Sequence, residues 1–266
     1  MRLDLKVAGF GQFIFWEGGS LWLALITAPG SLHLHHAVQI SLPLSGTVRF
    51  RRSQSTDWQD YPGAVIAPDL PHAFDAPERV VANILFEPES LAGRALIKKY
   101  GALGIATLTP RDTARLVGPI ASAYAGNAED SELVSLAKAV IADLSGMPTG
   151  PGATDQRVLK VIEHIRSHID ERISLASLAA AVHLSPSRLR HLFALETGVS
   201  CKSYILWERL NVALSLGFGG TSWTEAAHAA NFADSAHLSR TCRRMFGLAP
   251  TAGRIERATQ NAPVSA

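Results

Sequence analysis

The chain has 266 residues, of which 18% are charged, and its formal net charge is +2 at pH 7. This length favours two domains, each large enough to bury a core of its own. The longest apolar run near the start, residues 21–26, is too short to cross a bilayer, and Cys201 and Cys242 form neither a disulfide framework nor a metal-binding spacing. We therefore expect a cytoplasmic protein.

The first third of the chain predicts short strands separated by turns such as Pro29-Gly30 and Ser45-Gly46. The predicted strands cover residues 21–27, 38–44, 47–52, 64–66 and 79–86. Short strands with turns this close together are typical of a small antiparallel barrel or jelly roll. The segment resembles a cupin, and the resemblance implies a sensor barrel that binds a small-molecule effector.

Four polar residues in this segment form a candidate effector or metal site: His33, His35, Gln39 and His72. On a strand, positions 33, 35 and 39 share one face, and imidazoles at that spacing bind divalent transition metals. The spacing resembles the first cupin metal motif, with Gln39 in place of that family's glutamate. The alternating apolar positions 34, 38 and 40 also allow the histidine face to be solvated. Two interpretations stay open: a structural or ligand-contacting role without a cofactor, or a divalent transition-metal site. His36 is assigned no role.

Residues 92–144 are predicted to be helical, with a break at Gly118-Pro119. An amphipathic stripe follows the break, formed by Leu133, Leu136, Ala137, Val140, Ile141 and Leu144. The stripe either packs against the barrel or forms a homodimer seam through residues 131–144.

A Gly- and Pro-rich stretch, residues 145–154, separates the two halves of the chain. We expect one domain over residues 1–146 and a flexible linker over 147–154. Lys and Arg number 12 against 14 Asp and Glu up to residue 150, but 13 against 9 after it. A basic second half favours a phosphate-bearing partner.

A sequence pattern in this second half occurs twice, 49 residues apart. Ser185 and Asp234 are N-cap residues of two predicted helices, and Gly198 and Gly247 end them. In each helix a leucine, Leu189 or Leu238, marks the buried face, so the opposite face is exposed.

The exposed faces carry the candidate DNA-binding residues, and an exposed basic stripe on a short helix fits a major groove. These residues are Ser187, Arg188, Arg190 and His191 on the first helix, and Ser235, Ser239, Arg240, Arg243 and Arg244 on the second. We expect Ser187, Arg190, His191, Arg240 and Arg243 to read bases and Arg188 and Arg244 to contact phosphates. A solvated charged face is the alternative for either helix alone.

Each of these helices follows a shorter one, residues 174–182 and 222–230, as a helix-turn-helix requires. The turns between them place His183 and Asn231 where a positive φ is needed. A longer helix, residues 202–217, is apolar on more than one face and is predicted to lie between the two units.

These motifs resemble the AraC/XylS class of bacterial transcription regulators, through residues 184–189, 231–240 and 246–250 together with Tyr204 and Arg209. His183 and Asn231 stand where that class usually has glycines. The resemblance implies a double helix-turn-helix domain over residues 155–258, followed by a disordered tail over 259–266.

The sequence therefore predicts an α+β protein with a cupin-like sensor barrel and an all-α DNA-binding domain. We expect a one-component transcription regulator, not an enzyme, that binds double-stranded DNA at the bacterial nucleoid and responds to a small molecule or a metal. The alternative is a metal-dependent cupin enzyme with an accessory helical module.

Overall fold

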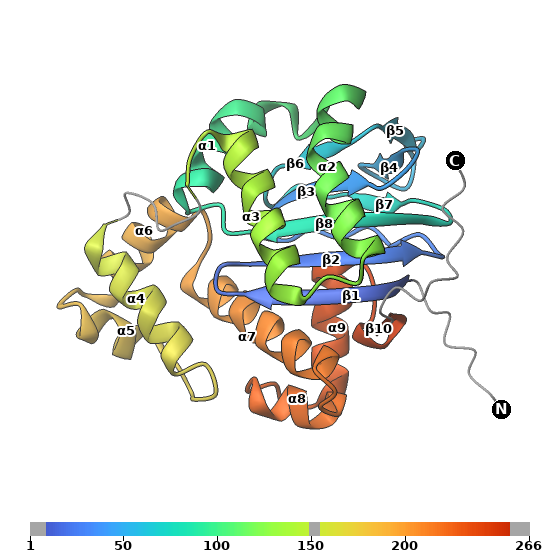
Figure 1. Cartoon of the computed structure of the whole chain (residues 1–266). Helices are drawn as coiled ribbons and strands as arrows, with labels where there is room; N and C mark the ends of the chain where they lie inside the picture. Colours follow the sequence, from blue (N-terminus) through green and yellow to red (C-terminus); the bar gives the residue numbers. More distant parts are fainter. Residues whose placement is uncertain (1–8, 149–154, 256–266) are drawn as a thin grey trace.

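A computed structural model describes residues 9–148 and 155–255 of the chain (Figure 1). Most of the predicted linker, residues 149–154, and the predicted tail, residues 259–266, lie outside the described residues. None of the described helices combines the length and apolar character needed to span a membrane.

The strands of the described residues form two sheets. The larger sheet has the order β10-β1-β2-β8-β3-β6-β9, and the smaller one has the order β5-β4-β7. The strands are β1 (Gly9–Trp16), β2 (Gly19–Ile26), β3 (Val38–Pro43), β4 (Val48–Arg51), β5 (Gln59–Tyr61), β6 (Ala64–Ile66), β7 (Ala73–Asp75), β8 (Arg79–Phe86), β9 (Ile105–Thr107) and β10 (Gly253–Ile255). Every predicted strand is present, so the mixed α+β fold is confirmed.

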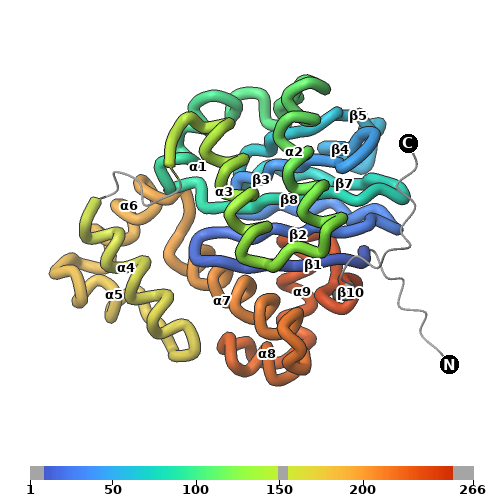
Figure 2. The backbone as a smooth tube through the Cα atoms, in the orientation of Figure 1, coloured from blue at the N-terminus to red at the C-terminus, as the bar shows by residue number. Residues whose placement is uncertain are grey.

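The helices follow the sheets in the chain and then dominate its second half, as Figure 2 traces. They are α1 (Leu91–Tyr100), α2 (Pro110–Ala125), α3 (Asp130–Ser145), α4 (Gln156–Ser167), α5 (Leu175–Ala181), α6 (Pro186–Thr197), α7 (Cys201–Phe218), α8 (Trp223–Ala229) and α9 (Ser235–Phe246), with short 3₁₀ helices η1 (Gly101–Leu103) and η2 (Pro250–Ala252).

The two faces of the larger sheet have different partners because successive side chains of a strand point to opposite faces. Ile14, Leu21 and Leu23 are buried in a core with helices α1–α3. Their neighbours Phe13 and Trp22 pack on the other face, against α7 and α9. Figure 1 shows α2 and α3 in front of the sheet and α9 behind it.

The smaller sheet packs on part of that second face. Val48, Phe50 and Tyr61 from the smaller sheet form one core with Ala24 and Ile26 from the larger one. The two sheets therefore pack face to face over a shared core.

The expected helix break at Gly118-Pro119 is wrong, because α2 continues through Pro119 to Ala125. Proline removes one backbone hydrogen bond from a helix interior. The helix continues because Leu116, Val117 and Ile120, on both sides of the missing bond, are buried against the sheet. The chain turns only after Ala125.

The apolar stripe on α3 is buried within the chain itself. Leu133, Ala137 and Ile141 belong to the core that also contains Leu21 and Leu23 of the sheet. The packing interpretation of this stripe is therefore confirmed.

The last described strand joins the first one. Gly253 of β10 pairs in parallel with Gly9 of β1, so residues assigned by sequence to the helical domain complete the larger sheet. The two ends of the described chain are thus held side by side.

Candidate DNA interface and effector site

The first predicted helix-turn-helix is formed by α5 and α6. The hydroxyl of Ser174 accepts a hydrogen bond from the backbone N–H of Ser177, and Ser185 does the same for Arg188. Gly198 ends α6 in the left-handed region, at φ 81°. These caps fix α6 locally, as the sequence predicts.

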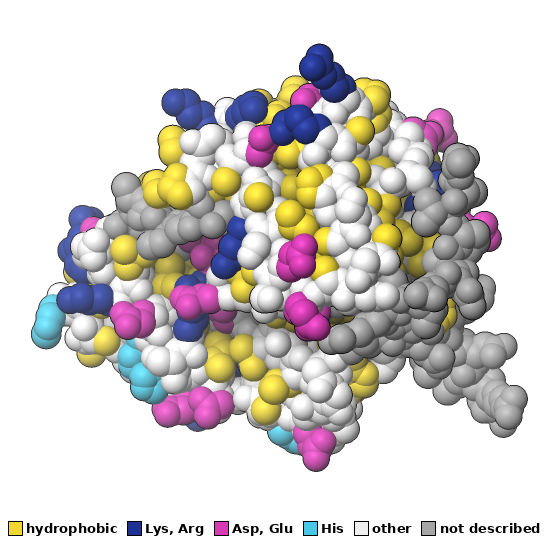
Figure 3. Space-filling model, viewed as in Figure 1, with side chains coloured by type: hydrophobic (Ala, Val, Ile, Leu, Met, Phe, Trp, Pro, Cys, Tyr) yellow, Lys and Arg dark blue, Asp and Glu magenta, His cyan; other side chains and the backbone are white. Residues whose placement is uncertain are grey.

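The exposed face of α6 carries the predicted residues. Ser187, Arg188, Arg190 and His191 are all exposed, whereas Leu189 is fully buried. Figure 3 shows Lys, Arg and His side chains at the edge of the molecule formed by α4–α6.

The second helix-turn-helix, α8 and α9, is built in the same way. Ser222 and Glu225 form a capping box, and Asp234 accepts a hydrogen bond of 2.6 Å from the His237 backbone N–H. Gly247 ends α9 at φ 74°. Along the helix, the outward face consists of the exposed residues Arg240, Arg243 and Arg244 and the half-buried residues Ser235 and Ser239.

The turns of both units contain a non-glycine residue in the left-handed region. The φ angles are 54° at His183 and 55° at Asn231, which confirms the prediction for both positions. The Asn231 amide also donates a hydrogen bond of 2.9 Å to the Asp170 carbonyl oxygen, and Asp170 lies between α4 and α5. The second turn is thereby tied to the first unit.

Helix α7 connects the two units by contributing to both of their cores. Tyr204 is buried with Leu189 and Phe193 of the first unit, whereas Leu210 and Leu214 are buried with Leu238 of the second. A continuous helix with a different core at each end holds the two units at a fixed spacing.

The second candidate site is a cluster of three histidines, and the fold brings all of them together. The rings of His33, His35 and His72 are buried, and one nitrogen of each lies within 4.8 Å of the others. His33 and His35 lie in an irregular segment before β3 rather than on a strand, and a single bridge pairs His33 with His72. The expectation that 33 and 35 share a strand face is wrong, and the face is dry rather than solvated.

Backbone carbonyls fix the orientation of each ring. The Nδ1 atoms of His33, His35 and His72 lie 2.8, 3.0 and 2.8 Å from the carbonyl oxygens of Ser31, Ala37 and Leu70. A proton on each Nδ1 leaves the three Nε2 lone pairs for another partner. His72 Nε2 is buried without a hydrogen-bond partner among the described residues.

Burial keeps these imidazoles neutral, which is the form that binds metals. Burial, followed by the repulsion that protonated His33 and His35 would exert on each other, lowers the pKa of His33 to about 3. Burial likewise lowers the pKa of His35 and that of His72.

Gln39 completes the donor set with its amide oxygen. His35 Nε2 lies 2.9 Å from Gln39 Oε1, while the Gln39 amide nitrogen donates to Ser41 and Asn83. Because a neutral imidazole has one N–H, it cannot donate to both Ala37 and Gln39. A cation at this point would satisfy the facing lone pairs. Three imidazoles and one amide oxygen fit a divalent transition metal such as Zn²⁺.

Residues 178–254 match the family described as a helix-turn-helix domain. The uncharacterized HTH-type transcriptional regulator YidL of Escherichia coli is 39% identical over 98 residues, which is 36% of this chain and 33% of YidL. The arabinose operon regulatory protein of Salmonella typhimurium is 31% identical over 147 residues, covering 51% of this chain and 50% of that protein.

Residues 178–254 are an AraC-type helix-turn-helix domain. The chain spans between a third and a half of the length of these two relatives.

A solved structure of similar fold covers nearly all of this chain. ToxT from Vibrio cholerae has a TM-score of 0.54 and 12% identity, over 88% of this chain and 97% of that one. ToxT has also been solved with an unsaturated fatty acid bound. At this identity the likeness concerns the fold alone.

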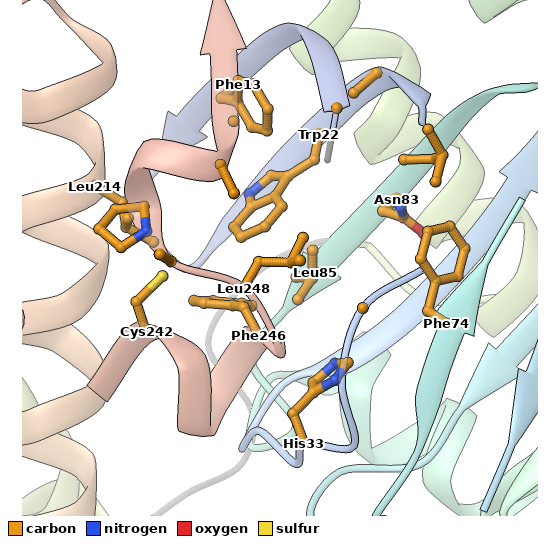
Figure 4. Close-up of a pocket in the computed structure, with 18 of the residues that line it drawn as sticks. Phe13, Trp22, His33, Phe74, Asn83, Leu85, Leu214, Cys242, Phe246 and Leu248 are labelled. Atoms are coloured by element: carbon orange, nitrogen blue, oxygen red, sulfur yellow. The ribbon is translucent and has the colours of Figure 1, made fainter. Parts of the chain in front are cut away.

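The AraC-type domain is docked against the sheets, which the sequence did not predict. Trp22 of β2 lies against Phe246 of α9, with ring centroids 4.5 Å apart. A cavity of about 90 Å³ lies beside this contact (Figure 4), bounded by apolar residues of both parts and by the polar residues His33, Gln39 and Asn83. The histidine cluster therefore borders the AraC-type domain.

A second set of contacts joins α4 and α7 to the end of β8. Arg166 of α4 forms ion pairs with Glu87, just after β8, and with Glu208 of α7. Tyr204 donates a hydrogen bond of 3.4 Å to Glu87. Arg166 and Glu87 are far apart in the sequence, so no local sequence pattern predicts this ion pair.

His36, for which the sequence predicts no role, forms a buried ion pair. Its Nε2 lies 3.1 Å from Glu89 Oε2, and both side chains are almost fully buried. Although burial lowers the pKa of His36, the nearby carboxylates of Asp69 and Glu89 raise it to about 9. The sequence did not predict this ion pair.

Proposed function

We propose that this chain is a sequence-specific DNA-binding transcription regulator. The observation that carries the proposal is the pair of capped helices, α6 and α9, whose exposed faces carry arginines and whose spacing is fixed by α7. Two recognition helices on a rigid connection can enter successive stretches of the major groove.

The outward side chains divide by their chemistry. Arg190, Arg240 and Arg243 are suited to bidentate hydrogen bonds with guanine, and Ser187 and His191 offer single hydrogen bonds to base edges. Arg188 and Arg244 are assigned to phosphates, which position the domain without reading sequence. The proposal places the protein in the cytoplasm, bound to double-stranded DNA.

Selection from random duplex DNA with the full chain tests this proposal. We expect enrichment of one sequence with two half-motifs about one helical turn apart. Recovery of unrelated duplexes at every salt concentration would contradict sequence-specific binding.

The effector is proposed to act where the sheets meet the AraC-type domain. Ligand sites commonly measure about 300–1,000 Å³, whereas the cavity here holds about 90 Å³. A small molecule of ordinary size must therefore displace a wall to enter this cavity, and α9 forms one of its walls. Effector binding would thus change the docking of the second recognition helix.

We further propose that His33, His35, His72 and Gln39 bind a divalent transition metal. Zn²⁺ titration of the metal-stripped protein, followed by calorimetry, tests it. We expect one ion per chain in the wild type and in His228→Gln, a change at an exposed histidine, and no tight binding after His72→Gln. Equal binding by all three proteins would assign the ion to another place.

The three histidines also favour a second function, that of a metal-dependent cupin enzyme. A metal bound there would supply Lewis acidity, and this chain's own contribution would be three oriented imidazoles in a dry site. DNA selection separates the two functions, since an enzyme with an accessory module has no reason to enrich a sequence.

A homodimer through residues 131–144 would have to use the outer face of α3, because the inner stripe is buried in the chain. Sedimentation at increasing protein concentration tests this part of the proposal.

A further inference from the structure

The loop that carries the histidines also caps the second recognition helix. The last carbonyl groups of a helix have no partner within the helix. At the end of α9, the Leu34 backbone N–H donates to the Arg244 carbonyl at 3.4 Å. The backbone N–H and the hydroxyl of Ser31 both donate to the Gly247 carbonyl, at 3.1 and 2.7 Å.

Ser31 faces the histidine cluster on its other side. Its carbonyl oxygen lies 2.8 Å from His33 Nδ1 and fixes that ring. One residue therefore contacts both the end of α9 and a side chain of the candidate metal site. Groups that orient a ligating histidine affect metal affinity, and their loss typically costs 10- to 100-fold.

We propose that metal binding at His33, His35 and His72 is coupled, through Ser31, to the docking of the second recognition helix. The inference rests on the metal site proposed above and adds how its occupancy reaches the DNA-binding domain. A cation on His33 Nε2 makes the Nδ1–H a stronger donor, which holds the Ser31 backbone in the position that caps α9. Coupling between two binding events is reciprocal, so a docked α9 must also strengthen metal binding.

A substitution at Gly247 can separate metal binding from the docking of α9. A Cβ added there would lie 2.5 Å from the Ser31 carbonyl oxygen and 2.6 Å from His33 Nδ1. Gly247→Ala therefore cannot dock without moving Ser31 or His33.

Gly198 provides the matched control. It ends the first recognition helix as Gly247 ends the second, at φ 81° against 74°, but an added Cβ meets no atom within 4 Å. Both alanine variants have the same left-handed strain, and only Gly247→Ala collides with the sensor loop.

The experiment compares Zn²⁺ affinity in full-length, metal-stripped wild type, Gly247→Ala and Gly198→Ala by competition with a chelating dye. We expect the affinity of Gly247→Ala to fall by about 10-fold or more and that of Gly198→Ala to match the wild type. Amide hydrogen exchange supplies a readout of docking. Zn²⁺ should slow amide exchange in residues 9–11 and 244–255 of the wild type and of Gly198→Ala. In Gly247→Ala, Zn²⁺ should not change the exchange of these residues.

Ser31→Ala tests the same link without a steric clash, because it removes only the hydroxyl bond to Gly247. We expect a smaller loss of Zn²⁺ affinity in the same direction, with an unchanged circular dichroism spectrum. This variant keeps the inference testable if Gly247→Ala does not fold.

The outcomes test the coupling separately from the proposed metal site and the proposed regulator function. Equal Zn²⁺ affinity in the wild type, Gly247→Ala and Ser31→Ala would overturn the coupling and leave the metal site standing. A wild type that binds no Zn²⁺ would overturn the metal site and the coupling together, whereas the DNA selection decides the regulator function independently.

Discussion

The ring of Phe13 on the first strand stacks on the ring of Phe218 at the end of α7, with centroids 4.1 Å apart and planes inclined by 6°. Phe218 also meets Trp223 of α8 edge-on, at 5.3 Å. A single buried side chain thus joins the sheet, the connecting helix and the second helix-turn-helix. The stability of the sheet-containing half and that of the AraC-type domain are therefore linked.

Phe218→Ala should lower the free energy of unfolding by about 3–5 kcal/mol, because it removes a buried aromatic ring and leaves a cavity. Urea denaturation measures the change. Leu195→Ala, at a side chain that is 79% exposed on α6, is the control and should change stability by less than about 0.5 kcal/mol. Equal effects of both changes would show that the sheet and α7 are not docked in solution.

Arg240→Ala should weaken binding to the selected DNA site by about 1–3 kcal/mol and affect random duplex much less. Gel-shift titration with both duplexes measures this difference. Arg111→Ala, an exposed change on α2 that removes the same charge, controls for net charge. An equal loss on both duplexes would assign Arg240 to a phosphate, the behaviour expected of Arg188.

Glu208→Gln should remove part of the pH dependence of stability. Burial raises the pKa of Glu208, although Arg166 opposes the shift. A carboxyl whose pKa is higher in the folded state binds more protons there, so stability falls as pH rises from the unfolded value near 4.5 through the folded one.

Urea midpoints at a series of pH values from 4.5 upward measure this effect. The wild type should lose more stability across the series than Glu208→Gln does, and Glu163→Gln, at an exposed glutamate, should follow the wild type. Parallel curves for all three proteins would mean that Glu208 is solvated or fully compensated by Arg166.

Asn231→Gly and His183→Gly should differ although the two turns have the same backbone conformation. Both changes relieve a positive φ, but only Asn231→Gly loses the hydrogen bond to Asp170. We expect Asn231→Gly to be less stable than His183→Gly by about 1 kcal/mol. Thermal unfolding of the two variants measures the difference, and its absence would mean that the bond does not tie the units together.

Local chemistry explains why the helical half could be predicted from sequence. Ser185 and Gly198, or Asp234 and Gly247, fix a helix through atoms a few residues away, and the leucine between them sets the buried face. The sequence also identified residues 33, 35, 39 and 72 as a candidate site, but it left open whether they bind a metal or have a structural or ligand-contacting role. Sequence spacing does not show whether a face is exposed to solvent or buried.

The sequence by itself determined two capped helices with basic exposed faces, the helix between them and the strands of the first half, because each depends on neighbours along the chain. Only the tertiary structure decided that α2 continues through Pro119, that Arg166 lies among glutamates, that His36 is paired and that Ser31 caps α9. These features depend on contacts between residues far apart in the chain, where burial removes water and so sets which charges, lone pairs and carbonyls must find one another.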